Sequence, residues 1–411
     1  MSGYDVVVVG GSPIGAAAAR HAASTGASVL LIEKGDGTGE PVRCAGIVSP
    51  HALEALGAST SSVLREICGG RLYAPGGRAI ELHADTTKAV VIDRGVLTRE
   101  LISAATAAGV VVRIHTQAVA ARKGLITIEN GRAREEVAVK VIIGADGPKS
   151  AIASWFSLSG PKRFLVAEQV VIAAEGRVGD GVEIFFGKDF APGFFAWAIP
   201  AEEGRLRVGL AATPGSDISI LLARLLREQF PGKVLTRIGG LIPIGPAETT
   251  VADGALLLGD AAGQVKPTSG GGLYTGGVCA RIAGQVAGDS AIGNAISSAA
   301  SAGAVDLEAL SVYERRWQEE IGDELKFGHA ARLLFSALTN EEIDRLFAAI
   351  DVPETLGMIA QNGDIDYPSR LIDSVLTQKK IRTRLLSAIG GWSRAQDLIR
   401  IAFASEGETP I

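Results

Sequence analysis

The stretch DVVVVGGSPIG, residues 5–15, constrains the fold most strongly, because it joins a buried strand to a helix through a glycine turn. Tyr4–Val9 is an apolar run apart from Asp5, which is typical of a parallel strand covered on both faces. Pro13 suits the first turn of a helix, and the alanine-rich stretch after it continues that helix. Residues 28–32 then predict a second parallel strand that ends at Glu33. Together these segments predict one βαβ unit.

The glycines of this turn match most of the GxGxxG pattern of dinucleotide-binding proteins. Gly10 and Gly15 fill the first and third places, and Ser12 stands in the second. In such motifs the glycines allow a tight turn and a close approach of the pyrophosphate. The acid at Glu33 can accept hydrogen bonds from both ribose hydroxyls of an adenosine. The alternative is a glycine-rich turn that binds nothing. The residues expected to contact the nucleotide here are Gly10, Gly11, Pro13, Ile14, Gly15, Glu33 and Lys34.

Two later segments indicate which nucleotide is bound. VIIGADGPKS, residues 141–150, ends a strand at an Asp-Gly pair, and GDAAGQVKPTSGGG, residues 259–272, follows another strand. A carboxylate at such a strand end can bind the ribityl hydroxyls of a flavin. A helix that starts near the triple glycine would aim backbone N–H groups at the flavin pyrimidine edge. The alternative is that each Asp only caps a turn. Three such segments in this order predict FAD, with contacts from Asp146, Gly147, Asp260, Gly271, Gly272 and Leu273.

The remaining pattern predicts an α/β fold: a Rossmann-like FAD-binding domain, an inserted antiparallel-sheet substrate domain and a C-terminal helical region. Residues 164–212 alternate as in an antiparallel sheet, and residues 306–411 have helical spacing. Residues 290–304 are expected to be a linker of small residues. The expected boundaries are 1–72, 93–153 and 245–300 for the FAD-binding domain, 73–92 and 154–244 for the substrate domain, and 305–411 for the helical region.

Charge and cysteine content exclude several classes of protein. The net charge of -5 over 411 residues argues against a nucleic-acid partner, which calls for a basic surface. Three cysteines are too few and too scattered for a disulfide framework or a zinc cluster, and the five histidines lack metal-ligand spacing. We therefore expect no metal and a reducing, cytoplasmic setting. The sequence contains no run of about 18 apolar residues, so it predicts no transmembrane helix.

The order of the three segments resembles the FAD-dependent enzymes of the para-hydroxybenzoate hydroxylase type. In DRGVLTREL, Arg94 matches an arginine that touches FAD in this group, although the group usually has an acid where this chain has Thr98. The sequence has no second GxGxxG-type unit for a nicotinamide nucleotide. An external reductant is therefore expected to dock transiently or to be another protein.

Two further stretches resemble the geranylgeranyl reductase family, which saturates isoprenoid chains. These are RCAGIVSPHALEALG, residues 43–57, and PGFFAWAIP, residues 192–200. In the second stretch, archaeal members typically read Pro-x-x-Tyr-x-Trp-x-Phe-Pro. This chain keeps the tryptophan as Trp197. It has Phe195 in place of the tyrosine and Ile199 in place of the phenylalanine. The tail KFGHAARLLFSALTNEEIDRLF is also similar, so the resemblance covers nearly the whole chain.

This resemblance implies an FAD-dependent reductase of isolated C=C bonds in geranylgeranyl chains of archaeal-type ether lipids. It implies an isoprenoid lipid substrate, peripheral contact with a membrane surface, and ferredoxin, a deazaflavin or NAD(P)H as electron donor. It places Cys44 beside the flavin, where the thiol is a proton relay, a gate or a compact filler. The further residues that it implies are Arg43, Cys44, Ala45, Gly46, Ile47, Arg94 and Ala118 for FAD, and Phe195 and Trp197 for the substrate.

Two other functions are consistent with the same residues. FAWAIP differs by one residue from the Trp-x-Trp-x-Ile-Pro pattern of flavin halogenases. A flavin-dependent hydroxylase or halogenase is therefore one alternative. Halogenases need a lysine near the cavity, and Lys88 is the candidate for it. The second alternative is a flavoprotein that only carries electrons or binds lipid.

Overall fold

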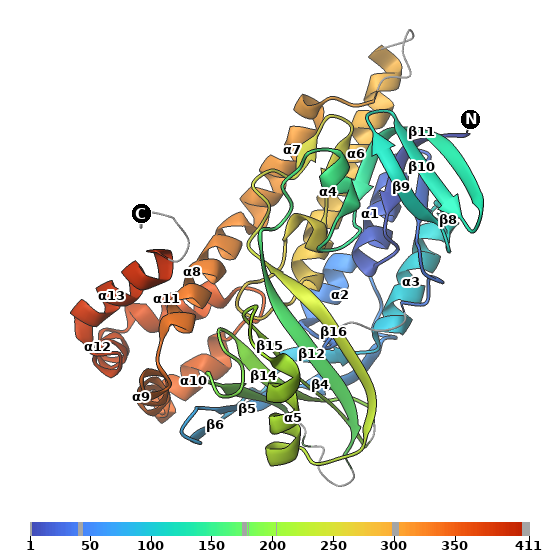
Figure 1. Ribbon diagram of the computed structural model, residues 1–411. Helices are drawn as coiled ribbons and strands as arrows, with labels where there is room; N and C mark the ends of the chain where they lie inside the picture. The colour runs from blue at the N-terminus through green and yellow to red at the C-terminus, as the bar shows by residue number, and fades with distance from the viewer. Residues whose placement is uncertain are drawn as a thin grey trace.

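The computed structural model describes residues 2–39, 44–174, 179, 181–202, 204–297 and 304–404 (Figure 1). Within these ranges the chain forms three sheets and a set of helices, and both kinds of element contribute to one elongated body. The parallel sheet lies at one end and the long antiparallel strands β12 and β16 run away from it toward the other (Figure 1). The α/β fold class expected from the sequence is confirmed.

The first sheet has eight strands, and its central part is parallel in the order β18-β11-β1-β2-β8. Strands β17, β10 and β9 extend it by antiparallel pairing. Residues 6–9 of β1 are buried, as a strand covered on both faces requires. The strands are β1 (Ser2–Val9), β2 (Val29–Ile32), β8 (Val111–Arg113), β9 (Gln117–Arg122), β10 (Leu125–Asn130), β11 (Ala133–Gly144), β17 (Val251–Ala252) and β18 (Ala255–Leu257).

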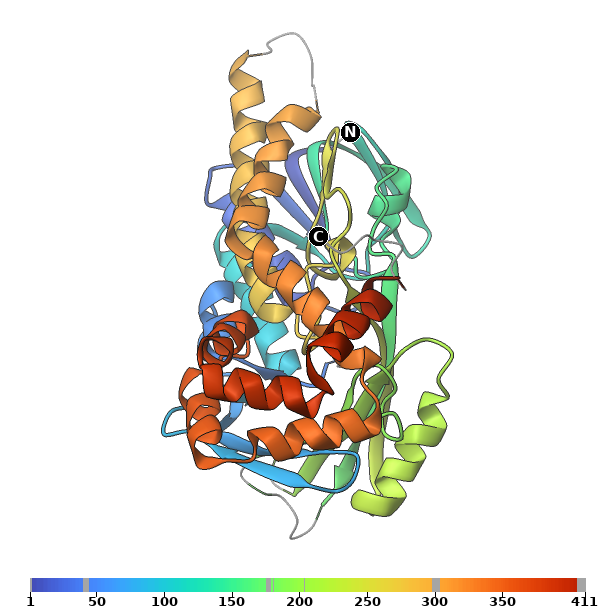
Figure 2. The same cartoon turned by 90° about the vertical axis from the view of Figure 1, so that its left-hand side faces the viewer.

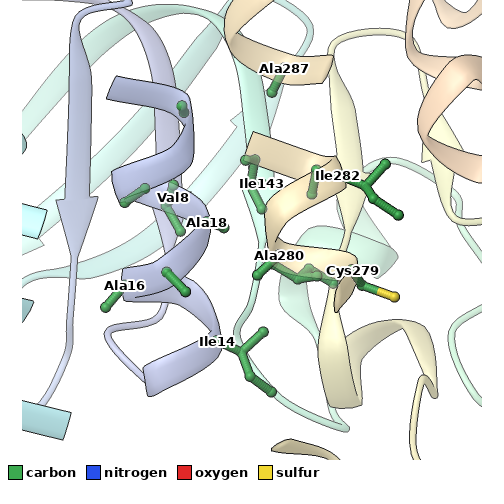
Figure 3. Packing of buried hydrophobic residues seen from close by; sticks show 14 of the residues in the cluster. Val8, Ile14, Ala16, Ala18, Ile143, Cys279, Ala280, Ile282 and Ala287 are labelled. Atoms are coloured by element: carbon green, nitrogen blue, oxygen red, sulfur yellow. The ribbon is translucent and has the colours of Figure 1, made fainter. Parts of the chain in front are cut away.

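Helices α1 (Pro13–Ala23) and α6 (Leu273–Ser297) pack directly against each other on one face of this sheet (Figure 3). The contact is close because small residues meet there. A Cβ at Gly284 of α6 would overlap the backbone of Ala18 in α1. Helix α3 (Arg94–Ala107) packs beside α1. The tight seam holds the glycine turn before α1 near the N-terminus of α6.

The second sheet has seven strands in the order β16-β12-β15-β14-β13-β5-β6, and a third sheet has three strands in the order β3-β7-β4. Helix α5 (Ile218–Gln229) packs on β12 and β15. The antiparallel sheet expected for residues 164–212 is therefore present. The strands are β3 (Ile47–Val48), β4 (Val63–Ile67), β5 (Gly69–Tyr73), β6 (Ala79–His83), β7 (Ala89–Ile92), β12 (Arg163–Ala173), β13 (Val182–Phe186), β14 (Phe195–Pro200), β15 (Arg205–Ala212) and β16 (Val234–Ile244).

The C-terminal part is helical, as expected. Its first helix, α7, packs against α6, and the helices that follow it lie across strands β5 and β6 (Figure 2). Helix α9 begins with a capping box formed by Thr339 and Glu342. The helices are α7 (Leu307–Trp317), α8 (Asp323–Ala337), α9 (Asn340–Ile350), α10 (Pro353–Asn362), α11 (Pro368–Thr377), α12 (Lys379–Ala388) and α13 (Gly391–Ala404), with a π-helical turn (Gln318–Gly322) between α7 and α8. Two short helices, α2 (Pro50–Leu56) and α4 (Ala151–Trp155), and a 3-10 turn (Gly259–Ala262) complete the elements.

One expectation was wrong. Residues 290–297 do not belong to a linker, because α6 continues through them to Ser297. Alanines favour the helix, and a stretch rich in small residues can therefore extend it as readily as interrupt it. Residues 298–303, the rest of the expected linker, lie outside the described ranges.

Candidate cofactor and substrate site

A cavity of about 630 Å³ lies between the second and third sheets, the glycine-rich loop before α6 and helices α10 and α11. Its volume is in the range of small-molecule sites, and most of its lining is apolar. Its lining comes from the cysteine turn, the start of α6, the β5–β6 hairpin and residues of α10 and α11. Of the expected site residues, those that line it are Ile14, Cys44, Ala45, Gly46, Ile47, Arg94, Phe195, Trp197, Asp260, Gly271, Gly272 and Leu273.

The first FAD segment forms a compact turn beside this cavity. A Cβ at Gly10 would overlap the carbonyl oxygen of Ala145, and a Cβ at Gly15 would overlap the carbonyl oxygen of Gly10. Ser12 caps α1 by accepting a hydrogen bond from the Gly15 N–H. The positive end of the α1 dipole therefore points toward the turn, with no acidic residue in the first helical turn to oppose a phosphate.

The carboxylate of Glu33 closes the same turn at the end of β2. Its Oε2 accepts a hydrogen bond from the Gly11 N–H at 2.7 Å, and its Oε1 accepts one from the Gly35 N–H at 2.7 Å. These bonds hold the Glu33 carboxylate at the carboxyl end of β2, where an adenosine ribose would reach it. Pro13 lies at the start of α1, and Lys34 directly follows the acid.

The third FAD segment is a loop closed on itself by backbone hydrogen bonds. The Lys266 N–H donates to the Gly271 carbonyl at 3.1 Å, and the Gly270 N–H donates to the Lys266 carbonyl at 2.8 Å. The loop places Asp260, Gly271 and Gly272 together on the cavity wall. Burial raises the pKa of Asp260 to about 6, and the nearby Arg94 guanidinium pulls it in the opposite direction.

The second FAD segment uses its acid locally. The Asp146 carboxylate accepts hydrogen bonds from the Ser150 hydroxyl at 2.6 Å and from the Ala151 N–H at 2.7 Å, so it binds the first turn of α4. Asp146 and Gly147 do not line the cavity, although open space adjoins Gly147. Ala118 is buried in β9 and does not line the cavity either. For these three residues an FAD contact stays a prediction.

The cysteine turn lies against the antiparallel sheet. Gly46 has a φ of 73°, a left-handed conformation that favours glycine. The Gly46 N–H donates to the Cys44 thiol sulfur at 3.3 Å. Arg207 donates to the Ala45 carbonyl at 3.1 Å, and Gln169 donates to the Cys44 carbonyl at 3.3 Å. Arg43, which precedes this turn, lies outside the described ranges.

The wall of the cavity formed by Phe194, Phe195 and Trp197 is aromatic. The rings of Phe194 and Phe195 stack at 4.2 Å, and the Phe195 ring meets Trp197 edge-on at 6.1 Å. The Trp197 indole N–H donates to the Gln169 side-chain oxygen at 2.8 Å. An aromatic wall of this kind offers π faces to an apolar chain and to positive charge that develops on it.

Sequence reasoning missed Gln169, Arg207 and Lys266, which all lie at this site. Gln169 and Arg207 are polar residues in strands that are mainly apolar, and that irregularity was a usable signal. Lys266 lines the cavity and donates to the Ile365 carbonyl and to Asp366 at 2.5 Å, which ties the glycine-rich loop to the segment before α11. Lys88 also lines the cavity, and its ammonium group donates to the Gln361 carbonyl at 3.2 Å.

The residues present fit an FAD molecule. The glycine turn excludes side chains where a pyrophosphate would approach, Glu33 is held where a ribose would lie, and the loop before α6 lines the cavity where the ring would lie. No helix within the described ranges has the length and apolar character needed to cross a membrane.

Comparison with known proteins agrees with this geometry. The profile of the FAD dependent oxidoreductase family matches residues 5–148. Digeranylgeranylglycerophospholipid reductase 2 of Methanopyrus kandleri is 33% identical over 380 residues, which cover 87% of this chain and 92% of that protein. Digeranylgeranylglycerophospholipid reductase of Methanothrix thermoacetophila is 32% identical over 84% of this chain and 91% of that protein.

A solved structure supports the fold over nearly the whole chain. A geranylgeranyl bacteriochlorophyll reductase-like protein of Thermoplasma acidophilum superimposes with a TM-score of 0.81 and 23% identity. The match covers 95% of this chain and 100% of that protein.

Proposed function

The chain belongs to the family of digeranylgeranylglycerophospholipid reductases, and from this premise we propose that it saturates isolated C=C bonds of geranylgeranyl chains in archaeal-type ether phospholipids. It is an FAD-dependent oxidoreductase. Its substrate is an isoprenoid lipid, and an external electron donor must reduce the flavin.

The observation that carries the proposal is the mostly apolar cavity, whose lining includes both the residues expected around a flavin and residues of the β5–β6 hairpin. A geranylgeranyl chain is long, flexible and apolar, so it needs an elongated apolar channel rather than a compact polar pocket. We further propose that the antiparallel sheet of residues 154–244 supplies the substrate domain, because Phe195 and Trp197 of that sheet line the channel.

Bound FAD supplies the hydride when it is reduced, and the chain's own residues set the conditions for its transfer. An isolated alkene has no carbonyl to activate it, so positive charge builds at its more substituted carbon. The faces of Phe195 and Trp197 stabilise such charge better than aliphatic walls do. The apolar lining also excludes water from the reacting carbons. Half-buried Cys44 lines the cavity, and we propose that its thiol delivers the proton.

The test is mass spectrometry of a geranylgeranylated ether phospholipid after incubation with anaerobically reduced protein. We expect a gain of two hydrogens for each double bond saturated, with the flavin reoxidised in step. Unchanged lipid with the flavin still reduced would contradict the proposal. In that case, oxygen and halide added to the same sample test for a hydroxylase or halogenase product.

A Trp197→Ala variant separates an enzyme from an electron carrier. For an enzyme, we expect alkene turnover to fall at least tenfold while FAD stays bound, because the cavity wall is lost. For a carrier, the rate of flavin oxidation by an artificial acceptor is the only activity and does not depend on this wall.

We propose that the electron donor is a ferredoxin, a deazaflavin or NAD(P)H that binds transiently. The sequence supports this because it has one GxGxxG-type unit and no second one for a nicotinamide nucleotide. Anaerobic stopped-flow measurements of flavin reduction by each donor identify the one that is used. A reductant that forms a stable complex with the protein would contradict the transient mode.

We also propose that the protein contacts the membrane surface through its C-terminal helices. Leu371 of α11 lines the cavity, and Leu376 on the same helix is 43% exposed. Trp392 of α13 is 68% exposed, and exposed Lys379 and Lys380 of α12 would attract anionic headgroups. Trp392→Ser is expected to weaken co-sedimentation with phosphatidylglycerol vesicles, and Ile220→Ser, at a similarly exposed apolar residue of α5, is the control.

A further inference from the structure

The strongest unassigned feature is a chain of hydrogen bonds that links the substrate wall to the cysteine turn. We propose that Gln169 is a positioning residue that sets the indole of Trp197 and the backbone of Cys44 in one fixed relation. The catalytic part of this inference rests on the proposed reductase function. The structural part, which is the coupling of Trp197 to Cys44, does not.

The side-chain amide of Gln169 has one orientation that satisfies both neighbours. An indole N–H only donates, so the Gln169 oxygen faces Trp197, at 2.8 Å from Nε1. A backbone carbonyl only accepts, so the Gln169 Nε2 faces the Cys44 oxygen, at 3.3 Å. Gln169 is buried and lines the cavity, so water does not readily replace either partner.

The backbone of Gln169 is as constrained as its side chain. Its strand, β12, is paired on both sides: Gln169 lies opposite Gly209 of β15 and opposite Ile238 of β16. Trp197 of β14 pairs with the same Gly209 from the other side. A Cβ at Gly209 would approach the indole ring to 2.7 Å, so this position leaves the space in which the indole lies against the sheet.

A second side chain of the same sheet holds the next carbonyl of the cysteine turn. Arg207 of β15 donates to the Ala45 oxygen at 3.1 Å and to the Ile92 oxygen at 3.1 Å. Two successive carbonyls, of Cys44 and Ala45, are therefore bound by two strands of the sheet that also carries the aromatic wall. The sheet, and not the cysteine turn itself, therefore sets the distance between the aromatic wall and the cysteine turn.

This arrangement matters for reaction geometry. The reacting alkene must lie between the flavin and the aromatic wall, and misplacement of reacting atoms by about 1 Å can lower a rate about 100-fold. Cys44 and Gly46 line the same cavity as Trp197, so a turn that shifts relative to Trp197 would change the gap in which the alkene lies. Gln169 therefore acts on the reaction through Trp197 and Cys44.

The experiment measures the reactivity of Cys44 and lipid turnover in the FAD-loaded protein. Iodoacetamide labelling of the Cys44 peptide is followed by mass spectrometry, which separates it from Cys68 and Cys279. Gln169→Met removes both hydrogen bonds at similar volume. We expect its Cys44 to be labelled about threefold to tenfold faster, and kcat to fall about tenfold or more. Trp197→Phe releases the Gln169 amide and is expected to accelerate Cys44 labelling as well.

The double variant tests the coupling directly. If Gln169 transmits the effect of Trp197, labelling in Gln169→Met/Trp197→Phe is no faster than in the faster single variant. Gln169→Glu keeps an acceptor for the indole and loses the donor to the Cys44 carbonyl, so it is expected to match Gln169→Met at Cys44. It also serves as the second variant if Gln169→Met does not fold.

Trp317→Phe is the matched control. Trp317 is a buried indole that donates to the Thr250 hydroxyl at 3.1 Å and does not line the cavity. Its loss is expected to leave Cys44 labelling unchanged. The inference is overturned if Cys44 is labelled at the wild-type rate in the Gln169 and Trp197 variants. It is also overturned if the increases in labelling rate of the two single variants add in the double variant. If the coupling is found but wild type reduces no alkene, only the proposed function falls.

Discussion

Arg94 and Thr98, one turn apart on α3, hold each other by two hydrogen bonds. The Arg94 guanidinium donates to the Thr98 hydroxyl oxygen at 2.9 Å, and that hydroxyl donates to the Arg94 carbonyl at 2.8 Å. A neutral hydroxyl thus takes the place where related enzymes usually have an acid. Arg94 lines the cavity beside Asp260, and Thr98 orients the Arg94 guanidinium without neutralising its charge.

Thr98→Val is expected to weaken FAD binding about tenfold. The substitution keeps the shape of the side chain but removes the partner that orients the guanidinium, and a hydrogen bond to a charged group contributes about 1.5–3 kcal/mol. Fluorescence titration of the FAD-free protein with FAD measures the effect. Thr106→Val on the same helix removes a hydroxyl that bonds only to the Ile102 carbonyl, and its FAD affinity should equal wild type.

Gly10→Ala is expected to abolish FAD binding. Gly10 has a φ of 112°, and its Cβ would overlap the Ala145 carbonyl oxygen, so the turn must open. Gly109→Ala is the control, because Gly109 has a φ of 91° but open space around its Cβ. It should lose about 1 kcal/mol of stability from backbone strain and still bind FAD. Equal FAD affinity in the two variants would refute the role of close packing.

Glu33→Ala is expected to lower FAD affinity about 10- to 100-fold. Gly11 and Gly35 hold the carboxylate where a ribose is expected, so its loss would remove charge-assisted hydrogen bonds to the ligand and loosen the turn. Isothermal titration calorimetry with FAD gives the affinity. Glu100→Ala removes a carboxylate that binds the Ser59 N–H and the Ser61 hydroxyl outside the cavity, and it should change FAD affinity little.

The FAD-free protein is expected to show a pH-dependent contribution from Asp260. Its pKa is raised from 3.8 to about 6 in the folded state, so the folded state binds the proton more tightly than the unfolded state does. This contribution is therefore full below about pH 4 and is lost as the pH rises to about 6. Thermal melts between pH 4 and 8 measure the effect. The stability of wild type relative to Asp260→Asn should fall between about pH 4 and pH 6 and stay level between about pH 6 and pH 8. A constant difference would mean that Asp260 is ionised throughout.

Ile184→Trp is expected to narrow the channel. Ile184 lines the cavity and pairs with Trp197 across β13 and β14. A larger ring there should raise KM for a geranylgeranyl lipid about tenfold and affect a shorter isoprenoid less. Overpacking costs about 1–3 kcal/mol of stability, so thermal melts accompany the assay. Ile184→Leu keeps the volume and should leave both KM values close to wild type.

The sequence alone predicted the parts of this protein that depend on local chemistry. The apolar run before Gly10, the proline at the start of α1 and the acid at the end of β2 define a βαβ unit, because each preference acts within a few residues. The glycine loop before α6 was recognised in the same way, whereas the aromatic strand β14 was recognised by its resemblance to a known family. The alanine-rich end of α6 was misread because small residues suit both a helix and a linker.

Only the tertiary structure decided how these parts meet. Gln169 and Arg207 hold the cysteine turn across 125 and 162 positions of the sequence, and no local pattern shows which carbonyls they reach. The structure likewise turned Asp146 toward α4 and tied Lys266 to Asp366. The physical reason is that a buried polar group must find a partner wherever the packed sheets bring one, and that choice is made by the whole fold.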